Sequence, residues 1–196
     1  MVENKRSLFD WRAKSFVLNK GKNGKEHAYC YCAKHFKFVA SHTDDKPNIV
    51  EIPTIVAARC RTMHERISFH HNHPALTPLS HGDLELLGRF PGLLEISAHT
   101  AMGASFRASR AKRWKSSWKR RFETLDAAFT FQSLSLQALP GFIGSLEMHT
   151  FNMILARARL IEYDFRLDAN LKSLYDCHRI LVDQMVKDIA ELGRGG

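Results

Sequence analysis

The chain has 196 residues, of which 44% are hydrophobic, and its formal net charge at pH 7 is +9. This length allows one well-packed core, and the composition excludes an intrinsically disordered chain. The sequence has no apolar run of roughly 18 residues and opens with polar residues, so we expect a soluble chain without a membrane span or a cleaved secretory signal. Four scattered cysteines in apolar surroundings favour buried thiols in a reducing compartment. We therefore expect a cytoplasmic protein, with delivery as an effector that lacks a cleaved signal as the alternative.

The N-terminal half alternates between strand and helix patterns. Residues 8–18 fit either a helix or a strand. Strands are predicted over residues 26–32, 36–40, 49–52, 66–70, 93–97 and 105–107. Helices are predicted over residues 54–65, with Thr54 as the N-cap, and from Ser80 onward. This order predicts an α/β (α+β) fold in which a mixed sheet is flanked by helices and which ends near residue 108.

Beyond residue 108 the pattern is helical. Apolar residues recur at helical spacing over residues 122–139, 151–161 and 171–192. We therefore divide the chain into a domain of residues 1–108 and a second region of residues 109–196, in which a basic segment precedes a helical extension. These helices could pack on the domain, pair with a second copy or bind a partner.

The basic segment, residues 107–121, has no acidic residue and contains Trp114 and Trp118. Its cations could neutralise the phosphates of a nucleic acid or another polyanion, while the tryptophans stack on bases. The alternative is an amphipathic helix whose tryptophans, four residues apart, dock on the protein. The candidate polyanion-binding residues are Arg110, Lys112, Arg113, Lys115, Lys119, Arg120 and Arg121.

The chemistry of the chain centres on His71, His73 and Asp83. Two histidines separated by one residue on a strand point to the same face, so both can bind one metal ion. Asp83, on the first turn of the following helix, could supply a third ligand and leave one position for water, as in catalytic zinc sites. Ser80 and Asp83 also fit a capping box, which would start this helix with or without a metal.

This segment resembles the signature of the JAMM (Mov34/MPN/JAB) metallohydrolases, in which a His-x-His-Pro strand is followed by Ser-x-x-Asp. The His-Asn-His-Pro form, residues 71–74, is similar to that of the bacterial and phage branches, including RadC-like and polymorphic-toxin-associated JAB domains. The resemblance covers residues 10–108 and implies a JAMM-like mixed sheet. The gap between His73 and Asp83 is one residue shorter than usual, which requires a tighter loop. His70 and His81 are neighbouring imidazoles that could replace Asp83 as a ligand.

The resemblance implies that Zn²⁺ bound by His71, His73 and Asp83 activates water to hydrolyse a peptide or isopeptide bond. A glutamate upstream completes the site in this family; Glu26 is the best match and Glu51 the second choice. Glu26 would accept the proton of the water, and Ser80 would donate a hydrogen bond to the oxyanion. The family often acts on a ubiquitin-like modifier or on its linkage to a target.

Two other classes of function remain open. A metal-dependent nuclease is suggested by the basic charge and by the letters His-Asn-His. The HNH endonucleases, however, spread these three residues over a ββα unit and usually add paired CxxC motifs, which this sequence lacks. The other class is a non-catalytic JAMM-like scaffold that contacts nucleic acid or a protein through the basic segment. Such a scaffold should keep its binding when the metal is removed or when Glu26 is mutated.

Overall fold

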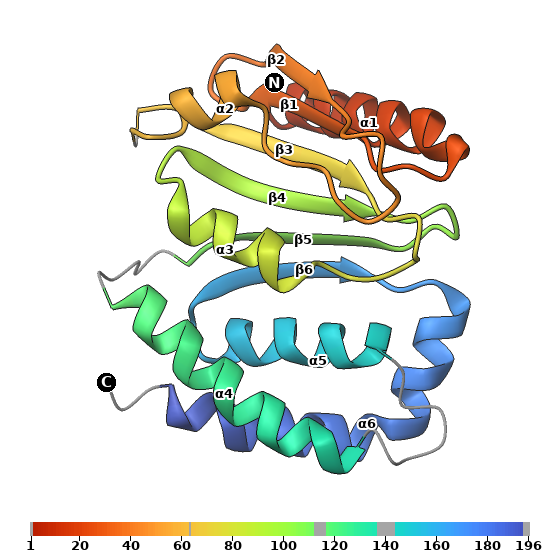
Figure 1. Cartoon of the computed structure of the whole chain (residues 1–196), viewed down its shortest axis with the longest axis vertical. Coiled ribbons are helices and arrows are strands. Elements are labelled where there is room, and N and C mark those ends of the chain that lie inside the picture. Colours follow the sequence, from red (N-terminus) through yellow and green to blue (C-terminus); the bar gives the residue numbers. More distant parts are fainter. Residues whose placement is uncertain (1, 63, 112–116, 137–143, 194–196) are drawn as a thin grey trace.

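The computed structural model describes residues 2–62, 64–111, 117–136 and 144–193. The described strands form a single mixed sheet in the order β2-β1-β3-β4-β5-β6 (Figure 1). Strands β3 and β4 run parallel, and the other neighbouring pairs are antiparallel. The elements in chain order are α1 (Val2–Lys20), the 3₁₀ turn η1 (Gly21–Asn23), β1 (Ala28–Cys32), β2 (Lys37–His42), α2 (Thr54–Arg59), β3 (Ile67–Asn72), α3 (His81–Arg89), β4 (Leu93–His99), β5 (Ser105–Arg110), α4 (Trp118–Leu136), α5 (Gly144–Arg157), β6 (Ile161–Arg166) and α6 (Ala169–Leu192). The predicted fold, a mixed sheet flanked by helices with helices at the C-terminal end, is confirmed.

Most of the predicted strands are confirmed, but residues 49–52 do not form one. Two of their backbone N–H groups are bound by side chains. The N–H of Val50 donates to the carboxylate of Glu26, and the N–H of Glu51 donates to Asp44 over 2.6 Å. Two of the backbone N–H groups of this segment are thus satisfied by carboxylates, without pairing to a strand.

The C-terminal region contains a strand where the sequence predicted only helix. Helix α5 ends at Arg157, and Ile161 begins β6, which pairs antiparallel with β5. The prediction of a helix through Ile161 was wrong because Ile161 continues the helical spacing of α5. A second signal was present: Ile161, Tyr163 and Phe165 alternate with charged residues, which is the period of a strand.

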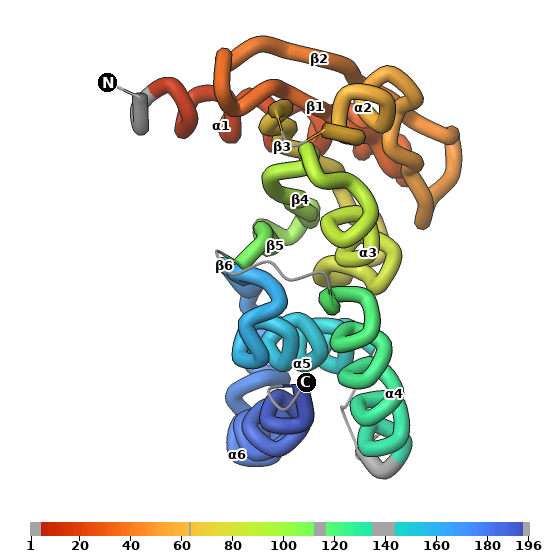
Figure 2. Tube along the Cα trace, turned by 90° about the vertical axis from the view of Figure 1, so that its left-hand side faces the viewer, coloured from red at the N-terminus to blue at the C-terminus, as the bar shows by residue number. Residues whose placement is uncertain are grey.

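The hydrophobic core extends from the sheet into the C-terminal helices. Ile96 of β4, Phe106 of β5, Leu125 of α4, Leu155 of α5 and Ile189 of α6 are all fully buried members of one cluster. Figure 2 shows α4, α5 and α6 grouped beyond β6, at the end of the sheet opposite α1. One continuous core therefore contains residues from both sides of residue 108.

Helices α1 and α3 pack on opposite faces of the sheet. The His70 side chain of β3 contacts Asp10 of α1, whereas the next residue, His71, contacts Asp83 of α3. This follows from the alternation of side chains along a strand. Within the described ranges, none of the helices has both the length and the hydrophobicity needed to cross a membrane.

Candidate metal centre

Strand β3 supplies two histidines that face the same side of the sheet. His71 is the fifth residue of β3 and His73 follows the end of the strand, and their side chains are almost fully buried. The Nε2 atoms of the two rings lie 2.7 Å apart. Two ring nitrogens at this separation cannot both present a lone pair unless a proton or a cation lies between them.

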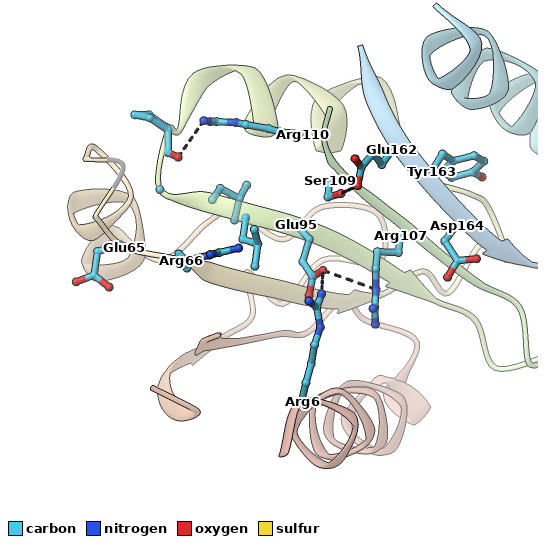
Figure 3. A pocket seen from close by; sticks show the side chains of 14 residues that line it. Arg6, Glu65, Arg66, Glu95, Arg107, Ser109, Arg110, Glu162, Tyr163 and Asp164 are labelled. Atoms are coloured by element: carbon cyan, nitrogen blue, oxygen red, sulfur yellow. Dashed lines mark hydrogen bonds and ion pairs between the residues drawn. The ribbon is translucent and has the colours of Figure 1, made fainter. Parts of the chain in front are cut away.

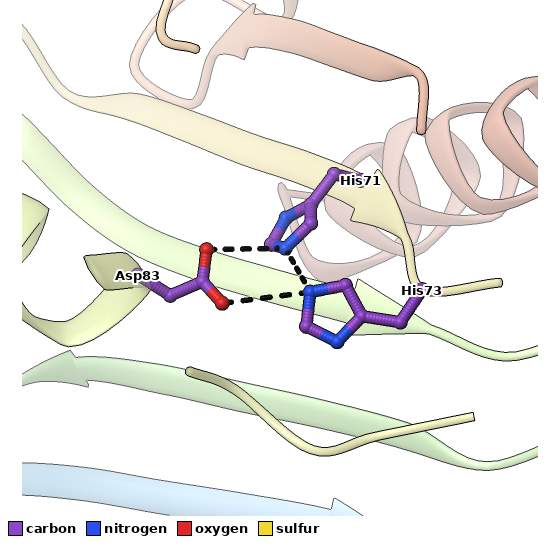
Figure 4. Close-up of side chains that lie close together, drawn as sticks. All are labelled: His71, His73 and Asp83. Carbon is purple, nitrogen blue, oxygen red and sulfur yellow. Dashed lines mark hydrogen bonds and ion pairs between the residues drawn. The ribbon is translucent and has the colours of Figure 1, made fainter. Parts of the chain in front are cut away.

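Helix α3 brings a carboxylate to the same point. Oδ1 of Asp83 is 3.2 Å from Nε2 of His71, and Oδ2 is 3.5 Å from Nε2 of His73 (Figure 4). The position of Asp83 is fixed by a complete capping box. Its backbone N–H donates to Oγ of Ser80, and its Oδ2 accepts hydrogen bonds from the backbone N–H and the hydroxyl of Ser80. The capping interaction that starts the helix thus also aims the carboxylate at the two imidazoles.

The hydrogen bonding of Nδ1, the ring nitrogen of each histidine that points away from Asp83, determines whether Nε2 can bind a cation. Nδ1 of His73 lies 2.8 Å from the carbonyl oxygen of Thr77, to which it donates. This bond keeps the proton on Nδ1, so Nε2 of His73 presents its lone pair to the cluster. Within the described part of the chain, Nδ1 of His71 has no hydrogen-bond partner.

The donor set fits a metal ion. The ligand atoms of His71, His73 and Asp83 all lie within 4.8 Å of one another. Two imidazole nitrogens and a carboxylate oxygen are a common ligand set for zinc. The hydrogen bond from His73 to Thr77 fixes the tautomer and the orientation of the His73 ring, as is usual for histidines that bind a metal. The shorter loop after His73 therefore does not prevent Asp83 from reaching the two histidines.

Burial and mutual charge together determine the protonation of these three groups. Burial raises the pKa of Asp83, but the two imidazoles outweigh it and hold that pKa well below its usual range. Burial lowers the pKa of His71, and Asp83 opposes this only in part. For His73 the hydrogen bond and charge of Asp83 overcome burial, so its pKa is raised. Asp83 therefore remains an anion, ready to neutralise a bound cation.

Glu26 lies in the same cleft, immediately before β1. The cleft has a volume of about 590 Å³, and Glu26, His73, Ser80 and Asp83 line it. Burial raises the pKa of Glu26 to about 7; the charge of His73 and the Val50 N–H lower it, and the charge of Asp83 raises it. A carboxylate with this pKa can accept and return a proton near neutral pH.

The other acidic and imidazole candidates lie elsewhere. Glu51 also lines the cleft but is exposed to solvent. His70 faces α1, where its Nδ1 lies 3.0 Å from Nε2 of His99. His81 turns toward the C-terminal helices: its Nε2 is 2.6 Å from Asp126 of α4, and its ring stacks on Phe151 of α5. Neither His70 nor His81 joins the cluster around Asp83.

A second group of potential ligands lies on the α1 face of the sheet. Asp10, His70 and Glu95 come together there, but two guanidinium groups already neutralise the carboxylates. Arg107 donates to Asp10 over 2.8 Å, and Arg6 pairs with Glu95 beside a pocket of about 660 Å³ (Figure 3). Burial raises the pKa of Asp10, but hydrogen bonds from His70 and Tyr31 and the charge of Arg107 lower it well below its usual range. This arrangement is an ionic network that fixes α1 to the sheet.

The basic segment is only partly described. Lys112, Arg113, Lys115 and Trp114 lie outside the described residues. Lys119 and Arg120 are exposed on α4.

Three other residues of the basic segment take part in the fold. Arg110 donates to the backbone carbonyls of Leu87, Phe90 and Pro91 at the end of α3. Arg121 donates to the carbonyls of Gly193 and Ala158. Trp118 is 7% exposed and stacks on Phe122, as the docking interpretation predicted.

Sequence reasoning missed two contributions of α5 to the site. Met148 lines the cleft, and Nδ2 of Asn152 donates to the carbonyl oxygen of Leu79, 3.2 Å away, next to Ser80. No spacing in the sequence links α5 to the histidine segment, so neither residue could have been identified from a motif.

Scans against protein-family models, the curated proteins and the solved structures gave no match. The functional interpretation therefore depends on the geometry of the site and on the motif that the sequence contains.

Proposed function

We propose that this chain is a zinc-dependent hydrolase of peptide or isopeptide bonds, of the JAMM type. The observation that carries the proposal is the convergence of His71, His73 and Asp83 at a cleft that the buried carboxylate of Glu26 also lines. The resemblance of residues 71–74, Ser80 and Asp83 to the JAMM signature supports the same assignment.

The three ligands would hold the metal beside the cleft that His73 and Asp83 line. When bound, zinc acts as a Lewis acid toward water and toward the carbonyl group of the substrate. Burial of the two imidazoles excludes competing solvent, and the Thr77 carbonyl keeps the His73 ring in the required orientation. Three protein ligands are the number typical of catalytic zinc sites, whereas structural sites have four.

Glu26 would act as the general base. Its pKa of about 7 leaves a substantial fraction ionised at neutral pH, able to take a proton from water and return it to the leaving amine. The backbone N–H of Val50 holds the carboxylate, and the Glu26 N–H donates to the carbonyl of Lys46 over 2.8 Å. The segment that contains Lys46 and Val50 therefore orients this base.

Ser80 would stabilise the oxyanion that develops on the substrate. Its hydroxyl is 2.8 Å from Oδ2 of Asp83, to which it donates. To serve a substrate oxygen, this hydroxyl must rotate away from Asp83. The backbone N–H of Ser80 also donates to Oδ2, so Asp83 keeps one capping bond when the hydroxyl moves.

The decisive measurement is the zinc content of the purified protein by elemental analysis. We expect about one zinc per chain in the wild type, with loss in His71→Ala and His73→Ala variants that remain folded by circular dichroism. His35→Ala, which changes an exposed histidine in the turn between β1 and β2, is the matched control and should keep its zinc. Absence of zinc from the wild type, even after zinc is supplied, would refute the proposal.

Glu26→Gln separates binding from catalysis. This variant should keep its zinc and lose hydrolysis of a peptide pool, because an amide cannot act as a general base. Zinc-loaded wild type that cleaves neither peptides nor isopeptide-linked conjugates would leave a metal site without the proposed activity. The same result would favour the scaffold alternative.

A further inference from the structure

The cleft beside the metal cluster extends along α3 and is largely apolar beyond its catalytic end. Its apolar lining includes Ile49 and Ile52 of the segment before α2, Leu86 of α3 and Met148 of α5. Ile49 is 53% exposed although its side chain is large and hydrophobic. An apolar cleft that leads away from polar catalytic groups is typical of a surface that binds part of a substrate.

Arg89 carries the positive charge of this cleft. It is the one lysine or arginine among the described residues that line it. Its guanidinium carbon lies 5.3 Å from the centroid of the neighbouring Phe90 ring, and the ion pairs within the described ranges include none to Arg89. The charge is therefore available to a ligand.

The geometry of α3 places Arg89 at a defined distance from the metal cluster. Gly82, Leu86 and Arg89 occupy one stripe of the helix, because residues at i, i+4 and i+7 face the same side. Arg89 follows Asp83 by six residues, which corresponds to about 9 Å along the helix axis. An extended peptide covers about 3.3 Å per residue, so this distance equals roughly three residues of substrate. Helical side chains tilt toward the N-terminus, which shortens the distance slightly.

Glu51, the acidic residue of the segment before α2, lies toward the catalytic end of the cleft. Glu51 follows Val50 directly, and the N–H of Val50 binds Glu26. Glu51 therefore lies near the catalytic base, whereas Arg89 lies about 1.7 turns of helix beyond Asp83. The charge of the distal part of the cleft is set by Arg89.

We propose that Arg89 selects peptide substrates that carry an acidic side chain two or three residues from the scissile bond, on the side that lies along α3. This proposal rests on the proposed function of the metal centre. The residue between the acidic side chain and the scissile bond would lie against Leu86 and Met148, apolar lining residues of the cleft. The favoured sequence thus combines an apolar residue near the cleavage point with an aspartate or glutamate farther along.

The first test is a cleavage profile. A complex mixture of peptides is digested with zinc-loaded wild type, Arg89→Glu and Arg61→Glu, and the products are sequenced by mass spectrometry. Arg61 is exposed and does not line the cleft, so it is the matched control for a change of charge.

We expect aspartate and glutamate to be enriched about threefold to fivefold at one position two or three residues from the cleavage point, as for one partly exposed ion pair. Arg89→Glu should lose this enrichment and favour lysine or arginine there, and Arg61→Glu should match the wild type. Wild type without acidic enrichment, or enrichment that survives in Arg89→Glu, overturns the proposal.

A binding measurement keeps this test independent of catalysis. Fluorescein-labelled pools of eight-residue peptides, with glutamate or serine fixed at one position, are titrated with the Glu26→Gln variant and followed by fluorescence anisotropy. Tighter binding of a glutamate pool to the Glu26→Gln variant, but not to the variant that carries both Glu26→Gln and Arg89→Glu, supports selection of acidic peptides by Arg89 even if no peptide is hydrolysed. Equal binding of the glutamate and serine pools refutes it, whatever the outcome for hydrolysis.

Discussion

Asn152 in α5 donates a hydrogen bond through Nδ2 to the carbonyl oxygen of Leu79, 3.2 Å away, in the loop that joins His73 to Ser80. Both residues are buried, and the bond ties the C-terminal helices to the loop that spaces the candidate ligands. The loop is one residue shorter than in the JAMM signature, so its path is tightly constrained. A substitution of Asn152 should therefore change the zinc affinity of the metal centre.

Asn152→Leu should reduce zinc affinity by about tenfold, as expected for outer support of a metal site, and reduce the free energy of unfolding by about 1–3 kcal/mol by leaving the Leu79 carbonyl unpaired. Thr150→Val is the matched control: Thr150 is equally buried on α5, but its hydroxyl bonds Leu146 within the helix. That variant should lose stability and keep its zinc affinity. Competition with a chelator and thermal unfolding measure the two effects. Equal zinc affinities in both variants would contradict the positioning role.

Ser80→Ala should distinguish the role of Ser80 as the N-cap of α3 from its proposed role in catalysis. Loss of the side-chain cap should cost about 1 kcal/mol of stability. The three ligands remain, so zinc should still bind, whereas kcat should fall about 10²-fold to 10³-fold if the hydroxyl stabilises the oxyanion. Asp168→Ala removes the corresponding cap of α6, where Asp168 accepts a 2.9 Å hydrogen bond from Leu171, and should lower stability alone. Comparable activity in the Ser80→Ala and Asp168→Ala variants would show that Ser80 serves only as a helix cap.

Glu95→Ala should destabilise the protein without affecting the metal centre. Glu95 is 1% exposed, pairs with Arg6 and accepts a hydrogen bond from Ser68 over 2.5 Å. Its loss should cost about 2–4 kcal/mol, below the value for a fully buried pair because the guanidinium groups are partly exposed. Zinc content of the folded fraction should be unchanged, since this network lies on the face opposite His71. Glu65→Ala, which breaks the partly exposed pair with Arg59, should cost less than about 1 kcal/mol.

His149 should make stability depend on pH. Burial lowers its pKa to about 4, and its ring is fully buried among aromatic side chains. The unfolded chain therefore binds a proton at higher pH than the folded one, so stability is retained above the ordinary histidine pKa of about 6.5 and is lost as the pH falls from there toward 4. The shift corresponds to about 3 kcal/mol. Urea unfolding of the wild type and of His149→Leu between pH 7 and pH 4 should show a smaller loss for the variant, and equal slopes would exclude this role.

The sequence predicted the centre of the site because its residues are close along the chain. His71, His73, Ser80 and Asp83 lie within one strand, loop and helix start, where local spacing determines direction. Glu26 was chosen as the match to the upstream glutamate that the JAMM resemblance implies, and it lines the cleft. Met148 and Asn152 come from a distant helix, and only tertiary packing brings them to the site.

The character of α1 could not be decided from the sequence for a physical reason. Its inward face carries Arg6, Asp10 and Lys14, which pair with groups on the sheet, beside the buried apolar residues Ala13 and Val17. A helix whose buried face mixes charged and apolar residues has no clear apolar stripe, so the spacing of apolar residues does not identify the helix. The partners of these charges, among them Glu95 and Ser105, lie about 90 residues away along the chain.

Strand β6 determines the order in which this molecule can be completed during synthesis. Strand β5 pairs with β4 on one side and with β6 on the other. Strand β6 begins at Ile161, some fifty residues after β5 ends, and both α4 and α5 are made in between. While that interval is being translated, β5 is an unpaired sheet edge, and the apolar face toward α5 is uncovered. An emerging chain of this kind presents a site for incorrect strand pairing until its last quarter leaves the ribosome. Slow or interrupted translation of residues 144–166 should therefore reduce the yield of native protein more than a similar delay near the N-terminus.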